Sequence, residues 1–314
     1  MRWKRKAFTF HVLERLPFGE RAYYWIQKNV TKSLVMTDEK YFDAFRRKVI
    51  RPLVAIKKYG QIPLNSARFF EFGAGWDLLC PLGFSILGGV NDSICVDLNE
   101  FMHKVDIYHC IDFYGRNIDE LKNRLNDKEL LETCKNGHEP IINKNTDILD
   151  FLKNSYGIEY KAPCDAGHTE LSDGSVDYIV VNTTLQHIPW EDVNRITKEC
   201  FRILKSGGLF ITNVNYLDHY ANFDRKINHY NFLQYSEKDW ARYSPSLHYQ
   251  NRRRHSDYQR CFLDAGFEIL QEDLYERKPD DLDKLRSIKL AKEFERYDED
   301  DLVILGSSFV LCKP

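Results

Sequence analysis

One segment constrains the fold of this chain more than any other: an apolar strand that runs into a glycine turn and then into an apolar helix. Residues 67–71 form the expected strand, Gly73-Ala74-Gly75 the turn, and residues 78–87 the helix. A second short apolar run follows at once, over residues 93–98. A strand, a glycine turn, a helix and a second strand in this order are typical of the opening of a doubly wound α/β sheet.

The same alternation of strands and helices continues to the end of the chain. Further strands are predicted at residues 160–164, 176–181, 209–214, 267–270 and 303–312, and helices at 36–58, 118–134, 146–156, 191–204 and 256–265. The predicted fold class is therefore α/β, a Rossmann-like doubly wound sheet of seven strands with helices on both faces. We divide the chain into an N-terminal helical cap (1–60) and one large domain (61–314). This domain holds a helical insertion (about 100–160) and a substrate segment (about 215–255).

Composition excludes several classes of protein. With 43% hydrophobic residues and a net charge of −2 over 314 residues, the chain can build a core and is not a globally basic nucleic-acid binder. No run approaches about 18 consecutive apolar residues, so no transmembrane span is expected. The eight cysteines include no CxxC pair, which suits a reducing compartment, and we expect a cytoplasmic protein.

The glycine turn and the acid that follows it predict a ligand with a ribose. Backbone N–H groups at such a turn can face a bound ligand, and Asp97 ends the next strand 22 residues after Gly75. An acid at about this distance commonly accepts hydrogen bonds from ribose hydroxyls. Two glycines also suit any tight turn, so these residues by themselves leave a purely structural turn open.

Three later segments give this pattern a family resemblance. Asp165-Ala166-Gly167 follows the third strand, LSDGSVDYIVVNTTLQHI spans residues 171–188, and RILKSGG spans residues 202–208. Together with EFGAG at residues 71–75, these segments closely resemble, in the same order, the motifs of the class I S-adenosylmethionine-dependent methyltransferases. The resemblance covers about residues 67–214 and implies S-adenosyl-L-methionine as the cofactor.

By that resemblance, the cofactor is held by residues at the carboxyl ends of the first four strands: Glu71, Gly73, Ala74, Gly75, Asp97, Leu98, Asp165, Ala166 and Asn182. Asp77 replaces the third glycine of the family's fuller motif. A carboxylate there would repel a dinucleotide pyrophosphate but tolerates a sulfonium, which favours a methyltransferase over a nicotinamide-dependent oxidoreductase. The long stretch between the second and third strands leaves the residues that contact the adenine open.

The methyl acceptor is expected to bind the segment 215–255, which follows the fifth strand at the ligand-binding edge of the sheet. From residue 224 to residue 260 there are eight basic residues against four acids, with tyrosines and a tryptophan between them. This mixture suits an acceptor with a phosphate or carboxylate beside a ring, and it suits a solvated surface equally well. The predicted substrate-binding residues are Tyr220, His229, Tyr230, Arg252 and Arg253.

Methyl transfer to a hydroxyl needs a base, and two histidines are candidates. His219 comes soon after the fifth strand and His187 soon after the fourth. Asp218, the third predicted catalytic residue, would orient His219 or hold a divalent ion, although no metal site is predicted. A purely structural hydrogen bond is the alternative role for either histidine.

The predicted function is transfer of a methyl group to a small polar acceptor, in the first place a sugar hydroxyl of a nucleotide sugar or surface glycan. The segment 215–255 resembles that of uncharacterised bacterial methyltransferases linked to polysaccharide synthesis. Two alternatives stay open: an RNA methyltransferase, which the charge balance disfavours, and a non-catalytic S-adenosylmethionine-binding protein. No nucleic-acid partner is predicted, and the oligomeric state is left open.

The N-terminal helices have two interpretations. Their apolar stripes, broken at Pro17, predict a lid that packs on the main domain. The basic cluster Arg2, Lys4, Arg5 and Lys6 instead predicts peripheral attachment to a membrane surface.

Overall fold

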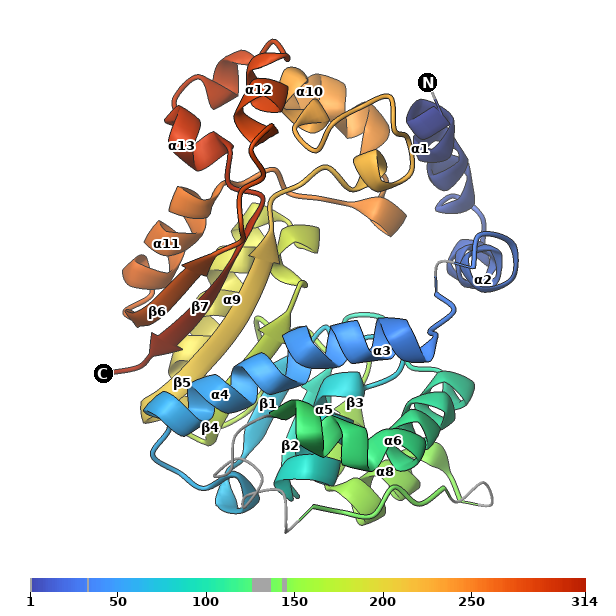
Figure 1. The fold of residues 1–314 in the computed structure, drawn as a ribbon, viewed down its shortest axis with the longest axis vertical. Coiled ribbons are helices and arrows are strands. Elements are labelled where there is room, and N and C mark those ends of the chain that lie inside the picture. Colours follow the sequence, from blue (N-terminus) through green and yellow to red (C-terminus); the bar gives the residue numbers. More distant parts are fainter. Residues whose placement is uncertain (1, 33, 126–136, 143–145) are drawn as a thin grey trace.

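Seven strands form one mixed sheet at the centre of the molecule (Figure 1). The computed structural model describes residues 2–32, 34–125, 137–142 and 146–314. The strands are β1 (Phe69–Phe72), β2 (Ser93–Val96), β3 (Ile158–Lys161), β4 (Val176–Asn182), β5 (Leu204–Asn215), β6 (Glu268–Leu274) and β7 (Gly306–Cys312). Their order is β3-β2-β1-β4-β5-β7-β6; the first five are parallel, and β7 runs antiparallel to both of its neighbours. This is the Rossmann-like fold of the methyltransferases, as predicted.

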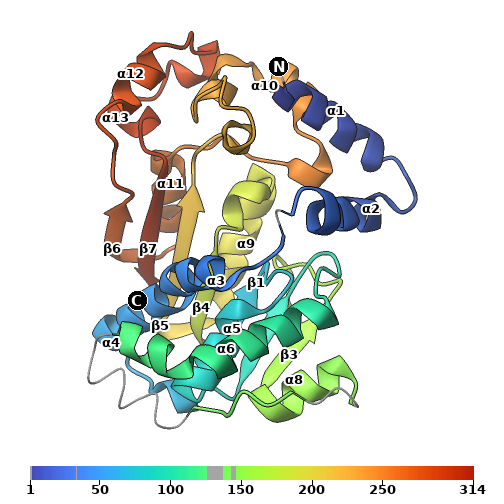
Figure 2. The ribbon, with the colours of Figure 1, turned by 45° about the vertical axis from the view of Figure 1, so that its right-hand side comes forward.

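Helices cover both faces of the sheet, which explains why the central strands are apolar on both sides (Figure 2). On the first face lie α3 (Asp38–Phe45), η2 (Arg46–Ile50), α4 (Arg51–Tyr59), α5 (Leu79–Gly88), α6 (Lys104–Leu125) and α8 (Ile148–Tyr156). On the second face lie α9 (Trp190–Ile203) and α11 (His255–Asp264). Successive side chains of a strand point to opposite faces, so that on β4 Val180 packs against the helices of the first face and Ile179 against those of the second.

Some predicted boundaries differ from the structure. α6 begins at Lys104, fourteen residues before the predicted start, because Ile107, Ile111 and Tyr114 already bury one face of a helix. Residues 126–134 of that prediction lie outside the described residues. Residues 205–208, which separate the predicted helix 191–204 from the predicted strand 209–214, belong to β5, which starts directly where α9 ends.

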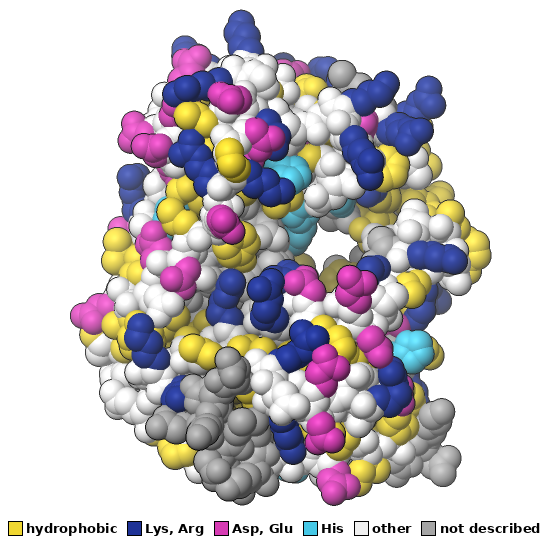
Figure 3. All heavy atoms as spheres, viewed as in Figure 1, with side chains coloured by type: hydrophobic (Ala, Val, Ile, Leu, Met, Phe, Trp, Pro, Cys, Tyr) yellow, Lys and Arg dark blue, Asp and Glu magenta, His cyan; other side chains and the backbone are white. Residues whose placement is uncertain are grey.

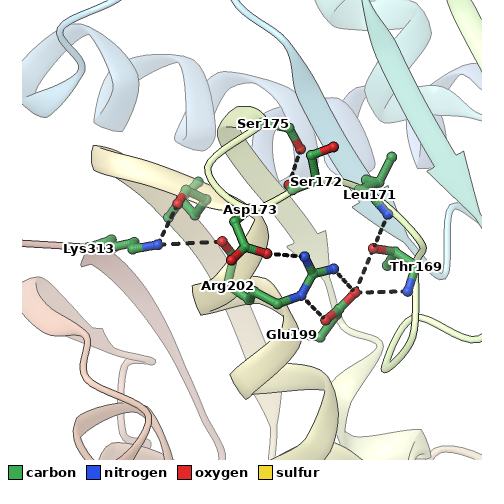
Figure 4. Close-up of polar contacts among 9 residues, drawn as sticks. Thr169, Leu171, Ser172, Asp173, Ser175, Glu199, Arg202 and Lys313 are labelled. Atoms are coloured by element: carbon green, nitrogen blue, oxygen red, sulfur yellow. Dashed lines mark hydrogen bonds and ion pairs between the residues drawn. The ribbon is translucent and has the colours of Figure 1, made fainter.

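The motif segment before β4 is tied to α9 by a polar network (Figure 4). Arg202 donates to both oxygens of Glu199 and to Asp173. Glu199 in turn accepts from the backbone N–H of Thr169 at 2.8 Å and from its hydroxyl at 2.7 Å. The guanidinium of Arg202 is the main reason that the pKa of Glu199 falls to about 2. These motif residues therefore fix the loop that leads into β4.

A helical lobe lies beyond the carboxyl ends of β4 and β5 (Figure 1). It is built from short helices that follow β5 and others inserted between β6 and β7. They are η6 (His219–Asn222), η7 (Asn231–Gln234), α10 (Glu237–Trp240), η8 (Ala241–Tyr243), η9 (Ser246–His248), α12 (Asp281–Arg286), η10 (Lys292–Phe294) and α13 (Glu299–Leu302). These helices share a third hydrophobic core, separate from the two cores of the sheet.

The predicted cap over residues 1–60 divides into two parts with different partners. α3, η2 and α4 pack on the sheet, whereas α1 (Arg2–Leu13) packs into the helical lobe through Trp3 and Ala7. Between them, α2 (Gly19–Trp25) and η1 (Ile26–Val30) span the distance from the lobe to the sheet domain (Figure 2). We call residues 2–32 the N-terminal arm. The space-filling view shows an opening bounded by the arm, the lobe and the sheet domain (Figure 3).

Candidate active site

The glycine turn after β1 has two glycines with different surroundings. Gly73 and Gly75 both have positive φ, 67° and 81°, which favours glycine. A Cβ atom on Gly73 would lie 2.3 Å from Cγ2 of Thr184, so this glycine lets the turn approach the loop after β4. A Cβ atom on Gly75 would meet nothing within 4 Å. Gly75 therefore exposes its backbone to open space, where a ligand can approach.

Asp97 lies beside this turn, at the end of β2. Its buried carboxylate accepts a hydrogen bond from the Tyr160 hydroxyl at 3.0 Å and further bonds from the backbone N–H groups of Gly75 and Ala74. Burial raises the pKa of Asp97 to about 7, although these donors oppose the shift. The structure thus brings together the glycines and the acid that the sequence placed at one site.

Glu71 and Asn182 end the pair of adjacent strands β1 and β4. Oε2 of Glu71 is buried and has no hydrogen-bond partner among the described residues, and burial raises the pKa of this carboxyl well above its usual range. Nδ2 of Asn182 lies 3.7 Å from Sγ of Cys80, whose thiol also contacts Glu71. Its Oδ1 accepts from Nδ2 of Asn213 at 2.8 Å. An unpartnered buried acceptor at this position suits a ligand that brings its own donor.

The remaining predicted cofactor residues lie past the ends of β2 and β3. The side chain of Leu98 is 69% exposed beside Asp97. The backbone N–H of Cys164 donates to the carbonyl of Asp97 at 2.8 Å, which brings the segment after β3 to the same edge. Asp165 pairs with Arg195 at 2.8 Å, whereas the side chain of Ala166 packs in the core of the second face.

Three histidines from three separate segments converge near the carboxyl ends of β4 and β5. The ring centroids of His187 and His219 are 5.0 Å apart, and those of His219 and His248 are 6.2 Å apart. His187 donates from Nδ1 to the carbonyl of Tyr249 at 2.8 Å, which leaves its Nε2 as the acceptor in the neutral ring. Among the described residues, no hydrogen bond engages a ring nitrogen of His219.

Burial is the main reason that the central ring of this cluster stays neutral. Together with the neighbouring His187, His248 and Lys6, it lowers the pKa of His219 to about 3. Lys6 reaches this region from α1, and its Nζ lies 4.8 Å from the ring centroid of Phe223. Histidine side chains are visible at the rim of the opening in Figure 3. The sequence prediction missed His248 and Lys6, because only the fold brings them to His219.

Asp218 does not orient His219 as predicted. Its carboxylate is fully buried, and it accepts from Nδ2 of Asn231 at 2.7 Å and from the backbone N–H of Tyr220 at 2.8 Å. Burial raises its pKa to about 6. These bonds make Asp218 the cap of η6, a structural role. Among the described residues, no three His, Cys, Asp or Glu side chains are arranged to hold a metal ion.

Several predicted substrate residues are instead part of the lobe's interior. The hydroxyls of Tyr220 and Tyr230 donate to backbone carbonyls at 2.7 and 2.9 Å, and both rings are buried. Arg252 is buried as well and pairs with Glu237 at 2.7 Å. The two hydroxyls already have partners, whereas Nε of Arg252 is buried without one among the described residues. That these three residues bind the acceptor stays a prediction.

The two other predicted substrate residues, His229 and Arg253, are partly exposed. The guanidinium of Arg253 lies 5.0 Å from the ring centroid of Trp190. A role in acceptor binding remains a prediction for both.

The comparisons with known proteins agree with this geometry. Residues 96–212 match the model of a family described as a methyltransferase domain. The matched residues run from the end of β2 into β5 and include Asp97. Over these residues the chain carries a methyltransferase domain. The protein is therefore an enzyme of the methyltransferase class, and S-adenosylmethionine is its cofactor.

Solved structures of methyltransferases are similar to this one at low sequence identity. A putative methyltransferase from Bacillus halodurans C-125 is 15% identical, with a TM-score of 0.43, covering 84% of this chain and 98% of its own. An S-adenosylmethionine-dependent methyltransferase from Methanosarcina mazei is 16% identical (TM-score 0.44; 82% and 96% covered). A geranyl diphosphate C-methyltransferase from Streptomyces coelicolor A3(2) is 13% identical (TM-score 0.42; 88% and 84% covered). No curated protein matches the sequence.

The methyltransferase site fits its cofactor, which supplies an electrophilic methyl group on a sulfonium when it is bound. Asp97 can accept from ribose hydroxyls, and the unpartnered Oε2 of Glu71 can accept from an ammonium group. Gly75 leaves room for the cofactor to approach the turn, and the exposed side chain of Leu98 offers an apolar surface to the adenine ring. Asp77, which lies at the start of α5, would meet no phosphate.

A stack of rings beside the methyltransferase's glycine turn was not foreseen. Trp76, directly after the turn, stacks on His103 with centroids 5.4 Å apart, and Tyr24 of the arm stacks on His103 at 3.9 Å. The Tyr24 hydroxyl also donates to Asp106 at 2.7 Å. The stack fixes α2 beside the cofactor site. The one sequence signal was a tryptophan next to the glycine turn.

Proposed function

We propose that this protein transfers the methyl group of S-adenosylmethionine to a hydroxyl of a small polar acceptor, in the first place a sugar of a nucleotide sugar or surface glycan. The observation that carries the proposal is the pair of rings His187 and His219, 5.0 Å apart beyond the ends of β4 and β5. Ligands bind at this edge of an open α/β sheet. The pair therefore lies where an acceptor hydroxyl would meet the methyl group.

The reaction on a hydroxyl needs a group that takes the proton, and no hydrogen bond among the described residues engages the ring nitrogens of His219. Its lowered pKa of about 3 keeps the ring neutral at pH 7, with a lone pair that can accept, but makes it a weak base in the free protein. As the proton reaches a ring nitrogen, the positive charge of the sulfonium disappears, so the total charge of the site does not change. His187 is the second candidate, since its hydrogen bond to Tyr249 leaves Nε2 free to accept.

The surroundings of the histidines support a small acceptor that combines hydroxyls with an apolar face. The ring centroid of Phe10, in the arm, lies 5.4 Å from that of His248 and 5.1 Å from that of Tyr23. Apolar rings and hydrogen-bonding groups therefore alternate there. Lys6 adds a positive charge that suits an acceptor with a negative group. Figure 3 shows charges of both signs interspersed on the visible face, which does not favour RNA.

The test is methyl transfer from labelled S-adenosylmethionine to a panel of nucleotide sugars, free glycans and RNA. We expect label on a sugar, with the methyl group on oxygen. Label on RNA alone, or cofactor binding without transfer to any acceptor, would refute the proposal.

Variants then identify the base. We expect His219→Ala to lower kcat by about 10²–10⁴-fold with little change in cofactor affinity, and His187→Ala to have a smaller effect. His109→Ala, at an exposed histidine on α6, is the matched control. Full turnover in both His219→Ala and His187→Ala would exclude the pair as the source of the base.

A further inference from the structure

A cavity of about 270 Å³ lies on the first face of the sheet, between η2 and α4 on one side and β5, β7 and β6 on the other. It is separate from the glycine turn, which lies beyond the end of β1. Its walls are apolar at Ile211 and Val310, and four cationic side chains and one acid also line it: Arg46, Arg47, Arg51, Lys58 and Asp273. In Figure 3, Lys and Arg side chains gather in the middle of the visible face.

Two of the residues that line this cavity carry buried hydrogen-bond donors without a partner. Nη1 of Arg51 and Oγ of Ser308 are both inaccessible to solvent and make no hydrogen bond among the described residues. Ser308, on β7, is only 5% exposed. Buried polar groups are almost always satisfied, so two unsatisfied donors in one cavity indicate an absent acceptor.

The nearby acids do not neutralise these donors. Asp43, outside the cavity, already accepts from Arg47 at 2.7 Å, and Asp273 accepts from Nε2 of Gln271 at 2.7 Å. The Arg51 guanidinium lies over the ring of Tyr275, 5.7 Å from its centroid. The cavity thus keeps an excess of positive charge and of donors, the combination that recognises phosphate oxygens.

We propose that this cavity binds the phosphate group of a small molecule, held by Arg51 and Ser308. The site is distinct from the cofactor site, because no residue of the glycine turn and not Asp97 lines this cavity. Inorganic phosphate species and phosphorylated metabolites share this chemistry, and a cavity of this volume admits a phosphate with a few further atoms.

The test is calorimetric titration of the full chain with pyrophosphate and with glucose 1-phosphate, at constant ionic strength. We expect both to bind. Arg51→Ala and Ser308→Ala should each weaken binding by about tenfold, the effect of losing one strong hydrogen bond. Arg260→Ala, an exposed arginine on α11, should change nothing. Tighter binding of glucose 1-phosphate would identify an organic phosphate as the ligand.

Two further readouts separate a binding role from a structural one. Because Ser308 has no partner, Ser308→Ala should leave the thermal unfolding temperature unchanged or raise it. S-adenosylmethionine binding should be equal in all variants, so failure here leaves the proposed function untouched. Absence of binding for both phosphates, or full affinity in either Arg51→Ala or Ser308→Ala, would overturn the proposal.

A second, independent observation concerns the outer surface of the N-terminal arm. Large hydrophobic side chains are exposed there, Phe8 at 70%, Phe18 at 67% and Trp25 at 58%, together with Val12 and Leu16. Phe8 and Val12 lie one turn apart on α1, Leu16 and Phe18 lie in the turn between α1 and α2, and Trp25 ends α2. An apolar surface of this kind is rare without a partner.

The charge of the arm indicates which partner it meets. Residues 2–32 contain eight basic residues against two acids, whereas the chain as a whole carries −2. Exposed Arg2, Arg5, Arg15 and Arg21 flank the apolar side chains. We infer that the arm lies on an anionic lipid surface, with the rings in the interface and the arginines near the headgroups. Among the described residues, no helix is long and apolar enough to cross a membrane.

The test is co-sedimentation with vesicles of phosphatidylcholine, with and without phosphatidylglycerol. We expect binding only to the anionic vesicles, and weaker binding as salt is raised. The double variants Phe8→Ser/Phe18→Ser and Arg5→Gln/Arg21→Gln should each lose binding, whereas Leu263→Ser, on α11, should not. Equal binding to neutral vesicles, or unchanged binding in either double variant, would overturn the inference. So would a protein that is dimeric in solution and becomes monomeric in the Phe8→Ser/Phe18→Ser variant only.

Discussion

Replacing Asp97 offers the sharpest test of the cofactor site, because its carboxylate is buried, holds a raised pKa and faces the glycine turn. Ribose hydroxyls would donate to the ionised carboxylate, so binding favours the deprotonated form. The free protein holds Asp97 protonated below a pH of about 7. We therefore expect the affinity for S-adenosylmethionine to fall as the pH drops below 7, and Asp97→Asn to remove this dependence.

The size of the effect follows from the raised pKa. The ionised fraction of a group with a pKa of about 7 falls from about one half at pH 7 to about one hundredth at pH 5, so the affinity should fall about 50-fold between these pH values. At pH 8, Asp97→Asn loses two charge-assisted bonds of about 1.5–3 kcal/mol each, offset in part by the internal donors that already serve the carboxylate in the free protein. The expected loss of affinity is therefore at least about tenfold.

Calorimetry from pH 5 to pH 8, in two buffers of different ionisation enthalpy, measures the affinity and the proton released together. Tyr160→Phe is the matched variant, because it removes a donor that lowers the pKa of Asp97 and should move the midpoint to higher pH. Affinity that is independent of pH in the natural protein, or unchanged in Asp97→Asn, would refute the reasoning.

The same carboxyl makes a prediction for the stability of the free protein. A pKa that is raised on folding favours the folded state while the group is protonated. Its contribution is complete below about pH 4 and is lost as the pH rises to about 7. Asp97→Asn should therefore stabilise the cofactor-free protein at pH 8, by up to about 4 kcal/mol, since folding raises the pKa from about 4 to about 7. Denaturant unfolding at pH 4.5 and pH 8 measures the difference, and equal effects at the two pH values would contradict it.

Four further substitutions test the packing of the glycine turn and of the lobe. Gly73→Ala should destabilise the fold by about 1–3 kcal/mol, because its Cβ would meet Thr184. Gly75→Ala is strained only by its positive φ, so it should destabilise the fold less and should also weaken cofactor binding; thermal unfolding and calorimetry separate the two effects. Trp3→Ala should weaken the packing of α1 against the lobe by about 3–5 kcal/mol. Amide hydrogen exchange should then become faster in the arm and the lobe only. Arg254→Met leaves three buried backbone carbonyls without their donor, and a loss of less than about 2 kcal/mol in denaturant unfolding would show that they find other partners.

The sequence was sufficient for the sheet and for the cofactor edge, because these depend on local patterns. The alternation of apolar strands with amphipathic helices can be seen in a single sequence. The carboxyl ends of parallel strands must then meet at one edge of the sheet. That is why the glycine turn and Asp97, 22 residues apart, were expected together and are found together. Boundaries were less certain where a helix begins without a strong cap, as at Lys104.

The tertiary structure alone decided the fate of the charged and aromatic segment after β5. Its sequence suits a binding surface and a solvated surface alike, yet Tyr230 and Arg252 are buried. Tyr230 donates to Val303, and Arg252 pairs with Glu293, both in the insertion between β6 and β7. Trp3 comes from the other end of the chain, and its backbone N–H donates to Asp224, 221 residues away. A sequence displays the chemistry of each side chain and its local period, but not which distant groups will satisfy it. Burial of an arginine is decided by such partners, because an unpaired charge could not remain there.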